Sequence, residues 1–182
     1  MTSHHLDRAT TAVLIVDIQE RLGAAMDSRA LERMVRRTVA LITGARALGL
    51  PLCVTEQYPK GLGPTVAAVR EAMPGLAVRE KSSFSCLADG IPEALAGKSQ
   101  VLIAGMETHV CVFQTARDLA AIGVTPYLCA DAVLSRTEED RQVGLDLCRA
   151  AGGVVTTVEA ALFDLLGRAG TPEFKAVSAA VK

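Results

Sequence analysis

The chain has 182 residues, of which 50% are hydrophobic and 21% are charged, and its formal net charge is -1. This composition indicates one globular domain with a hydrophobic core of its own. A near-neutral charge, with two Tyr, four Phe and no Trp, offers nucleic acid neither a basic surface nor rings for stacking, so we expect no nucleic-acid partner. No apolar run is long enough to cross a membrane, and residues 1–5 do not resemble a signal peptide, so we expect no membrane association.

The five cysteines are an odd number, and none of them forms a CxxC pair. We therefore expect reduced thiols in a cytoplasmic protein rather than a disulfide framework. Cys53, Cys129 and Cys148 fall in predicted strands or on a helix face, and we expect them in the core. Cys86 falls in a predicted loop after Lys81, and we expect its side chain to be exposed.

The first half of the chain alternates between predicted strands and helices. Residues 11–17 are a continuous run, rich in β-branched side chains, that ends in an acid, which is typical of a parallel strand buried on both faces. Residues 28–48 carry apolar side chains at helical spacing, and Gly49 ends that helix. The elements expected next are a strand at 50–55, a Gly- and Pro-containing loop at 56–64, a helix at 65–73, a strand at 76–80 and a helix at 91–96.

The second half continues the alternation. The apolar run 101–104 predicts a fourth strand, which leads through a turn at 105–111 into a helix that runs to about Gly123. Ser135 or Thr137 can cap a further helix, with acidic residues in its first turn and a basic residue in its last, as the helix dipole favours. The other elements expected are strands at 124–130 and 153–157, a helix at 158–166 capped by Thr157, and a helical tail at 171–182.

Six strands that alternate with helices indicate a three-layer, doubly wound α/β fold around a six-stranded, mainly parallel sheet, similar to a Rossmann fold. The sequence shows no internal repeat, linker or low-complexity segment. We therefore expect a single domain over residues 1–182, with its core at about 11–166 and the helical tail at 171–182. A nucleotide-binding Rossmann domain is disfavoured, because no G-x-G-x-x-G follows the first strand.

In open parallel sheets, ligands bind beyond the carboxyl ends of the strands. The predicted strands place Asp17, the loop at 55–64, Lys81, the turn at 105–111 and Asp131 at those ends. Asp17 could accept a proton from the thiol in that turn, and Lys81 could stabilise both anions. The alternatives are that Asp17 only caps the turn after it and that Lys81 is a solvated loop charge. Their joint position favours the functional interpretation.

Cys111 lies in this turn between a strand and a helix. Free N–H groups and the positive end of the helix dipole favour a thiolate there, so we expect the pKa of Cys111 below its usual value of about 8.5, although Asp17 opposes the shift. The same N–H groups could hold an oxyanion formed when the sulfur attacks a carbonyl. The alternative is that Cys111 is a small buried apolar residue, and its placement alone leaves both interpretations open.

Four segments carry a resemblance to a known family. They are residues 13–19 (VLIVDIQ), 55–65 (TEQYPKGLGPT), 81–85 (KSSFS) and 105–116 (GMETHVCVFQTA). Together, and in this order, they resemble the isochorismatase-like cysteine hydrolases over nearly the whole chain, from about residue 11 to residue 166. The loop at 55–65 is most similar to the small isochorismatase domain-containing proteins.

The resemblance implies an isochorismatase-like fold and a catalytic triad of Asp17, Lys81 and Cys111. It also implies a cis peptide bond between Met106 and Glu107, which would direct the backbone N–H groups of Glu107 and Cys111 at an oxyanion. By their positions in the chain, close to the predicted strand ends, further residues are expected to line the substrate pocket: Gln19, Leu22, Tyr58, Ser82 and Phe84.

The metal site of the related nicotinamidases is not expected here. Those enzymes carry an Asp-x-His pair after the second strand and a further histidine, whereas residues 56–58 of this chain are Glu-Gln-Tyr and its only histidines are His4, His5 and His109. We therefore expect no metal and no other cofactor. We expect His109 to be structural, because the family places its base on the aspartate.

The retained triad favours a metal-independent hydrolase that cleaves the C–N bond of a small amide, or a related carbonyl metabolite, through a thioester on Cys111. The alternatives are an isochorismatase-type vinyl-ether hydrolase with Asp17 as its acid, and a non-catalytic interaction module on the same fold. The helical stretch 110–122 carries only two charges, Arg117 and Asp118. We therefore expect a homo-oligomer, a dimer or higher, that covers part of this surface.

Overall fold

The computed structural model describes residues 4–182; residues 1–3, part of the segment compared with signal peptides, lie outside the described residues. Its centre is one six-stranded sheet in the order β3-β2-β1-β4-β5-β6, and every neighbouring pair of strands is parallel. The prediction of a doubly wound, mainly parallel sheet is therefore confirmed. The strands are β1 Thr11–Val16, β2 Leu52–Gln57, β3 Val78–Lys81, β4 Gln100–Met106, β5 Thr125–Leu134 and β6 Val154–Thr156.

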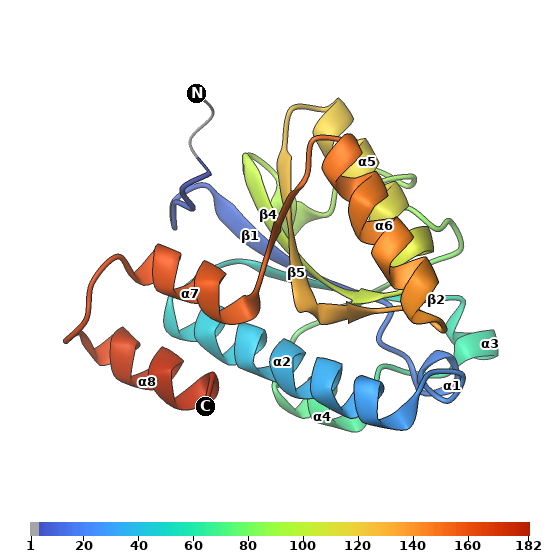
Figure 1. Ribbon diagram of the computed structural model, residues 1–182, viewed down its shortest axis with the longest axis horizontal. Coiled ribbons are helices and arrows are strands. Elements are labelled where there is room, and N and C mark those ends of the chain that lie inside the picture. Colours follow the sequence, from blue (N-terminus) through green and yellow to red (C-terminus); the bar gives the residue numbers. More distant parts are fainter. Residues whose placement is uncertain (1–3) are drawn as a thin grey trace.

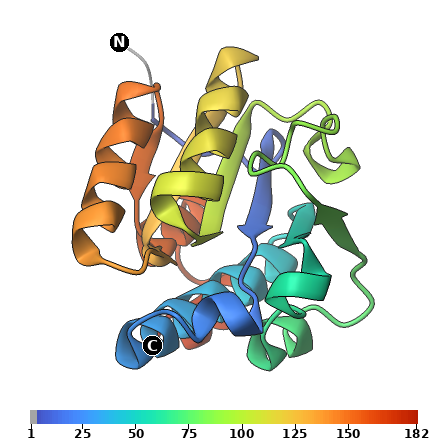
Figure 2. The same ribbon diagram turned by 90° about the vertical axis from the view of Figure 1, so that its right-hand side faces the viewer.

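Helices cover both faces of this sheet, which makes three layers (Figures 1 and 2). One face carries α2 (Ser28–Ala47), α7 (Val158–Leu166) and α8 (Pro172–Ala180), and the other carries α5 (Phe113–Ala121) and α6 (Glu138–Ala150). Shorter helical segments are α1 Glu20–Gly23, α3 Pro59–Leu62, α4 Ala67–Glu71, the 3₁₀ turn η1 Glu93–Leu95 and the π-helical turn η2 Thr108–Val112. Within residues 4–182, no helix combines the length and the apolar character that a membrane span requires.

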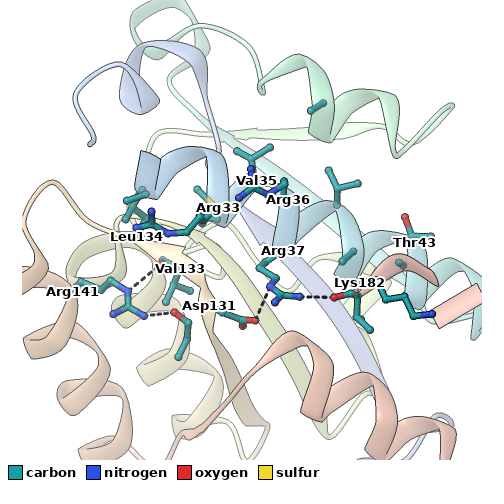
Figure 3. A pocket seen from close by; sticks show the side chains of 18 of the residues that line it. Arg33, Val35, Arg36, Arg37, Thr43, Asp131, Val133, Leu134, Arg141 and Lys182 are labelled. Atoms are coloured by element: carbon teal, nitrogen blue, oxygen red, sulfur yellow. Dashed lines mark hydrogen bonds and ion pairs between the residues drawn. The ribbon is translucent and has the colours of Figure 1, made fainter. Parts of the chain in front are cut away.

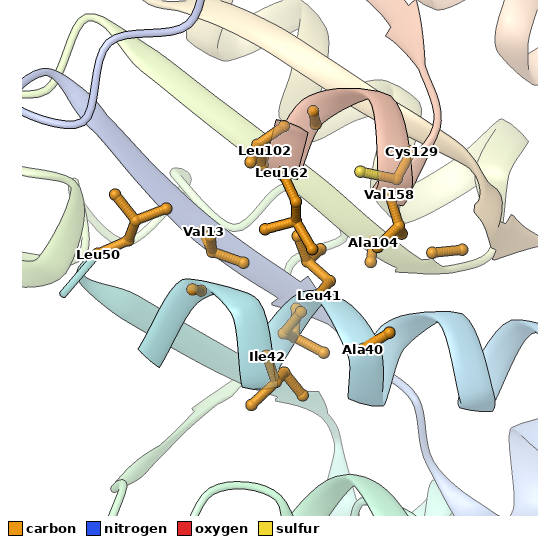
Figure 4. Close-up of a cluster of buried hydrophobic side chains, with 14 of the residues drawn as sticks. Val13, Ala40, Leu41, Ile42, Leu50, Leu102, Ala104, Cys129, Val158 and Leu162 are labelled. Atoms are coloured by element: carbon orange, nitrogen blue, oxygen red, sulfur yellow. The ribbon is translucent and has the colours of Figure 1, made fainter. Parts of the chain in front are cut away.

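Strand β1 shows why both faces need cover. All of its residues are buried, and alternate side chains belong to opposite layers of the core. Val13 and Ile15 lie in the apolar cluster beneath α2, whereas Leu14 lies in the cluster beneath α5 and α6. Figure 4 shows Val13 in this cluster together with Leu41 of α2 and Leu162 of α7. The run of β-branched residues therefore forms the middle of the core on both sides.

The fifth strand is longer than predicted. The expected strand ends at Asp131, but β5 continues to Leu134, because its last residues pair with the end of β4 after a register shift that follows Ile103. Asp131 thus lies inside β5, where its Oδ1 accepts a hydrogen bond from the Val158 N–H at 2.9 Å and caps α7. Asp131 is therefore not a free side chain at the carboxyl end of its strand, where the sequence predicts it to lie.

Two predicted helices also differ. The helix expected at 91–96 is only the 3₁₀ turn Glu93–Leu95, because Pro92 precedes it and Gly97, with a φ of 70°, ends it. The helix expected directly after the turn at 105–111 begins as the π-helical turn η2, and α5 starts only at Phe113. Cys111 consequently lies inside η2, two residues before the first residue of α5.

Candidate active site

The strand order reverses between β1 and β4, since the chain runs from β1 outward through β2 and β3 before it returns to β4. In this class of fold, such a reversal leaves a crevice at the carboxyl ends of the two strands, where ligands bind. Asp17 directly follows β1, and η2, which carries Cys111, follows β4. Lys81 is the last residue of β3. The candidate residues are therefore at the edge of the sheet that the sequence predicts.

Asp17 and Lys81 form a buried ion pair. Lys81 Nζ donates to Asp17 Oδ2 at 2.6 Å. The Lys81 side chain is 3% exposed and the Asp17 side chain is 0% exposed. Thr55 Oγ1 donates to the other carboxylate oxygen of Asp17 at 2.7 Å. Asp17 holds a φ of 51°, which turns the chain sharply as it leaves β1. Partners on both oxygens offset the cost of taking this carboxylate out of water.

The lysine is fixed by more than its ion pair. Besides Asp17, Lys81 Nζ donates to Gln57 Oε1 at 2.8 Å and to the backbone carbonyls of Ser83 and Phe84 at 3.1 and 3.0 Å. An ammonium group has three N–H donors, so these acceptors use its full capacity. Lys81 is therefore a fixed cation beside the carboxylate rather than a solvated loop charge.

Cys111 is 6% exposed and belongs to the apolar cluster beneath α5 and α6. Burial is the main cause that raises the pKa of its thiol, and the Asp17 charge adds to the rise, as does a hydrogen bond between the two side chains. The Lys81 charge lowers the pKa of Cys111 but does not compensate. The prediction that the pKa of Cys111 lies below its usual value is therefore wrong. Burial and the Asp17 carboxylate raise this pKa by more than the Lys81 charge lowers it.

The turn before Cys111 has an unusual backbone. The Met106–Glu107 peptide bond is cis, the isomer that the resemblance implies at this place. Gly105 has a φ of 138°, and a Cβ at this position would lie 2.0 Å from the Val16 carbonyl oxygen, so no larger residue fits between β4 and β1. The chain therefore leaves β4 tightly against β1, which brings η2 next to Asp17.

A second group of contacts holds this turn on the side of β5. The Thr108 N–H donates to Ser135 Oγ at 3.1 Å, and His109 Nδ1 lies 3.0 Å from the same oxygen. Glu107 accepts hydrogen bonds from the backbone N–H and Nε of Arg136 at 3.1 and 3.0 Å. His109 thus contacts Ser135, and its structural role remains our prediction.

The residues expected to line the substrate pocket differ in where the structure places them. Tyr58 and Ser82 line a cavity of about 360 Å³ together with Lys81. Gln19 is fully buried, and its amide binds the backbone of Gln57 and Gly63, so it joins β2 to the following loop. Leu22 packs on the cluster beneath α2, and Phe84 is 53% exposed. Their contact with substrate stays a prediction.

The prediction that Cys86 is exposed is wrong. It is 2% exposed, because its backbone N–H donates to Thr115 Oγ1 at 3.0 Å and draws the loop after β3 onto α5. Its sulfur lies 3.6 Å from Thr55 Oγ1, which also binds Asp17. Thr55 and Gln57 are site residues that the sequence does not single out. The signals for them are their place in the segment 55–65 and their position at the end of β2, next to the strands that carry Asp17 and Lys81.

Comparison with known proteins identifies the family. A family model described as Isochorismatase domain matches residues 11–160. The chain belongs to the isochorismatase domain family. Its fold is that of the isochorismatase-like hydrolases, as the parallel sheet already indicates.

Three relatives illustrate how far the likeness of this isochorismatase domain extends. Isochorismatase domain-containing protein 1 of Salmo salar is 38% identical over 177 residues, which cover 96% of this chain and 62% of that protein, so the chain spans less than two thirds of this relative. Secreted isochorismatase effector Isc1 of Phytophthora sojae is 34% identical over 180 residues, covering 95% of this chain and 85% of that protein. The solved structure of MAR1 ribonuclease from Caenorhabditis elegans superposes with a TM-score of 0.90 at 33% identity, covering 97% of this chain and 92% of that one.

Among residues 4–182, no three His, Cys, Asp or Glu side chains are grouped closely enough to hold a metal ion. Glu56 lies near the end of β2, in the segment where nicotinamidases place metal ligands. Its Oε1 accepts hydrogen bonds from the backbone N–H and Oγ1 of Thr65, at 2.6 and 2.7 Å. Glu56 of the isochorismatase domain therefore holds the loop after β2 in place through its hydrogen bonds to Thr65.

Proposed function

We propose that this isochorismatase domain hydrolyses a small amide or related carbonyl compound through a thioester on Cys111, with Asp17, Lys81 and Cys111 as its triad. One observation carries the proposal. The buried Asp17 carboxylate lies 2.6 Å from Lys81 Nζ, and it is near enough to the Cys111 thiol to raise the pKa of that thiol further than burial alone does. A carboxylate held in this way can take the proton of the thiol while the lysine keeps it oriented.

The first half of the reaction forms the thioester. Cys111 passes its proton to Asp17 as its sulfur bonds to the carbonyl carbon. Because burial and Asp17 keep the pKa of the thiol high, proton transfer accompanies the attack rather than preceding it. The carbonyl oxygen becomes an oxyanion, and the donors that we assign to it are the backbone N–H groups of Glu107 and Cys111. The C–N bond then breaks, and the leaving nitrogen takes the proton from Asp17.

The second half consumes water. Asp17 is again a carboxylate, and it accepts a proton from the water that attacks the thioester carbon. The C–S bond breaks, the carboxylic acid leaves, and the proton returns from Asp17 to the Cys111 sulfur. Lys81 remains a cation throughout, because its N–H groups stay on Asp17, Gln57 and two carbonyls. No step needs a metal or an organic cofactor.

Of the three triad residues, Lys81 lines a small cavity, which it shares with Tyr58 and Ser82. The volume of this cavity, about 360 Å³, lies in the lower part of the range of about 300–1,000 Å³ for small-molecule sites, so it is consistent with a small substrate. The cytoplasm is the compartment that we assign, because all five cysteines of the chain are unpaired.

The alternatives make different demands on Asp17. A vinyl-ether hydrolase needs a protonated Asp17 that donates to its substrate, whereas the two oxygens of this carboxylate already accept hydrogen bonds from Lys81 and Thr55. A non-catalytic module needs neither the ion pair nor the thiol. Because the similar C. elegans protein is called a ribonuclease, RNA is a necessary test substrate.

A substrate panel of small amides, esters, a vinyl ether and a short RNA tests the proposal. We expect turnover of an amide or ester by the wild-type chain and by Cys148→Ala, a control that removes a buried thiol outside the site. Cys111→Ala and Asp17→Asn should each lower turnover by a factor of about 10²–10⁴. Treatment with EDTA should leave the rate unchanged. Full activity of Cys111→Ala, or turnover of the vinyl ether or RNA alone, would refute the thioester mechanism.

A further inference from the structure

A cavity of about 860 Å³ lies on the α2 side of the sheet, away from the catalytic side chains. Its walls are α2, the last part of β5, the first turn of α6 and residues 180–182 (Figure 3). Cys111 belongs to the apolar cluster on the opposite face of the sheet. The volume lies in the range of about 300–1,000 Å³ that small-molecule sites occupy. The volume therefore suits a small-molecule ligand, and the position of the cavity separates that ligand from the Cys111 side of the sheet.

The floor of this cavity is apolar. Met34 and Leu134 are part of the buried cluster beneath α2, and they are 2% and 7% exposed. The aliphatic side chains that line the cavity are Met34, Val35, Val39, Ala40, Leu134 and Val181. A ligand that fills this space therefore gains by placing hydrocarbon against the floor.

The rim of the cavity is cationic. Arg33 lies three and four positions before Arg36 and Arg37, so all three project from neighbouring positions of α2. Arg141 of α6 lies across from Arg37, beyond Val133 (Figure 3). In all, five cationic side chains and two acidic ones line the cavity. This excess of positive charge is local, because the whole chain has a net charge of -1.

The arginines are held in place without using all of their donors. Arg37 binds Asp131 Oδ2 at 3.6 Å and the Val181 carbonyl at 2.8 Å. Arg141 donates to two backbone carbonyls of β5. Among residues 4–182, Arg33 has no hydrogen-bond or ion-pair partner. Because a guanidinium group carries five N–H donors, this rim keeps free donors that point to an anionic ligand.

We propose that this cavity binds an amphipathic organic anion, with a carboxylate or phosphate head at the arginine rim and an apolar body on the floor of Met34 and Leu134. An inorganic anion would leave the floor exposed to water. An uncharged apolar molecule would cover the rim and leave the guanidinium groups without partners, which is costly. Only a ligand with both parts satisfies both surfaces.

Calorimetric titration with octanoate tests the proposal on the whole chain, with octanol and acetate as probes that lack the charge and the tail. We expect octanoate to bind at least about tenfold more tightly than either probe, and its affinity to fall as salt is raised. Equal affinity for octanol and octanoate would overturn the role of the rim, and equal affinity for acetate and octanoate would overturn the role of the floor.

The double variant Arg33→Gln/Arg36→Gln removes two exposed cations of the rim, and Arg29→Gln is the matched control, since Arg29 is exposed on α2 outside the cavity. The double variant should bind octanoate about tenfold more weakly, whereas Arg29→Gln and Cys111→Ser should bind it like the wild type. Three results would contradict the proposal. The first is that the double variant and the control bind octanoate with equal affinity. The second is that octanoate protects Cys111 from alkylation. The third is that the wild type binds no octanoate and the double variant has a lower molecular mass than the wild type, which would make the cavity an interface between copies.

Discussion

The Asp17 carboxylate serves two partners of opposite character, a lysine cation and a thiol. Its two oxygens accept hydrogen bonds from Lys81 and Thr55 at 2.6 and 2.7 Å, and its charge acts on the nearby Cys111 thiol. The carboxylate raises the pKa of the thiol that it is positioned to deprotonate. In the proposed mechanism, the thiol therefore stays protonated beside Asp17 until a substrate is bound, and Asp17 takes its proton as the sulfur attacks.

The variant Asp17→Asn should separate thiol reactivity from catalysis. Removing the carboxylate charge removes a cause that raises the pKa of Cys111, so alkylation of Cys111 at pH 7–8 should become faster while turnover is lost. Peptide mapping after timed iodoacetamide treatment measures the alkylation rate. The matched control is Asp146→Asn, which neutralises an exposed acid on α6 and should change neither quantity. Slower alkylation in Asp17→Asn would show that the carboxylate does not hold the thiol protonated.

The buried thiols predict a loss of stability in alkaline solution. Burial is the first cause that raises the pKa of Cys53 from 9.0 to about 11 and that of Cys148 from 9.0 to about 12. Above pH 9 the unfolded chain releases these protons while the folded chain keeps them, so the free energy of unfolding falls as the pH rises toward 11 and 12. Denaturant melts at pH 8, 9 and 10 measure this slope.

The comparison that isolates the two thiols is the double variant Cys53→Ala/Cys148→Ala. Its free energy of unfolding should fall less steeply between pH 8 and pH 10 than that of the wild type, because other titrating groups are common to both. Identical slopes would mean that these two thiols ionise in the folded chain as readily as in the unfolded one.

At the scale of elements, the π-helical turn η2 is held between β4, β5 and α6. Ser135 of the loop after β5 binds the backbone of Thr108 at 3.1 Å. On α6, Gly144 lies so close that a Cβ at its position would be 2.7 Å from the His109 backbone nitrogen. The position of Cys111 therefore depends on a helix that begins only at Glu138, well after it in the sequence.

The variant Gly144→Ala tests this dependence. The added methyl group meets backbone rather than a flexible side chain, so η2 or α6 must shift, and we expect the free energy of unfolding to fall by about 1–3 kcal/mol. Turnover should fall by more than the folded fraction explains, because Cys111 moves relative to Asp17. Gln142→Ala, at an exposed position of the same helix, should leave both quantities near their wild-type values. If Gly144→Ala has the same turnover as the wild type, the position of Cys111 does not depend on the packing of α6.

The sequence predicts those elements whose pattern is local. The β-branched run at 11–17 and the strands predicted to end at residue 80 and near residue 105 follow from composition and spacing, and the structure has the corresponding strands, with β3 ending one residue later at Lys81. The extension of β5 past Asp131 is not predictable in this way, because it depends on a register shift against β4. The helix expected at 91–96 shrinks to one turn because the flanking Pro and Gly limit it more than its apolar spacing indicates.

Burial and side-chain partners are harder to predict, because they arise between distant segments. The sequence predicts a lowered pKa for Cys111, since the turn and Lys81 are visible in it, whereas the apolar cluster around the sulfur is not. It predicts an exposed Cys86, since the contact with Thr115 joins two segments that are far apart in the chain. Thr55 looks like an ordinary strand residue until β1 and β2 are paired.

At the scale of the whole molecule, the α5 and α6 layer leaves apolar side chains uncovered. Ile122, which follows α5, is 51% exposed, and Val143 and Leu147 of α6 are 50% and 39% exposed. Val143 and Leu147 are four residues apart and so lie on one face of the helix. We infer that a second copy of the chain covers this face, in line with the expected homo-oligomer.

Light scattering at micromolar concentration measures this association. We expect the wild type to be larger than a monomer, and Val143→Glu/Leu147→Glu to shift the mass toward the monomer, because charges oppose burial of the face. Leu76→Glu, at an exposed apolar residue outside α5 and α6, should keep the wild-type mass. A monomeric wild type would refute self-association, and an unchanged mass in the double variant would place the interface elsewhere.

The central claim is that Cys111 is the nucleophile and forms a thioester. The most direct measurement is a rapid-quench reaction with p-nitrophenyl acetate, in which the released p-nitrophenolate and the mass of each cysteine peptide are followed together. We predict a stoichiometric burst of p-nitrophenolate and an acetyl group on the Cys111 peptide, both absent in Cys111→Ala, with the acetyl group lost again as water clears the thioester. Product release by the wild type without an acetyl group on Cys111, and at the same rate in Cys111→Ala, would contradict it.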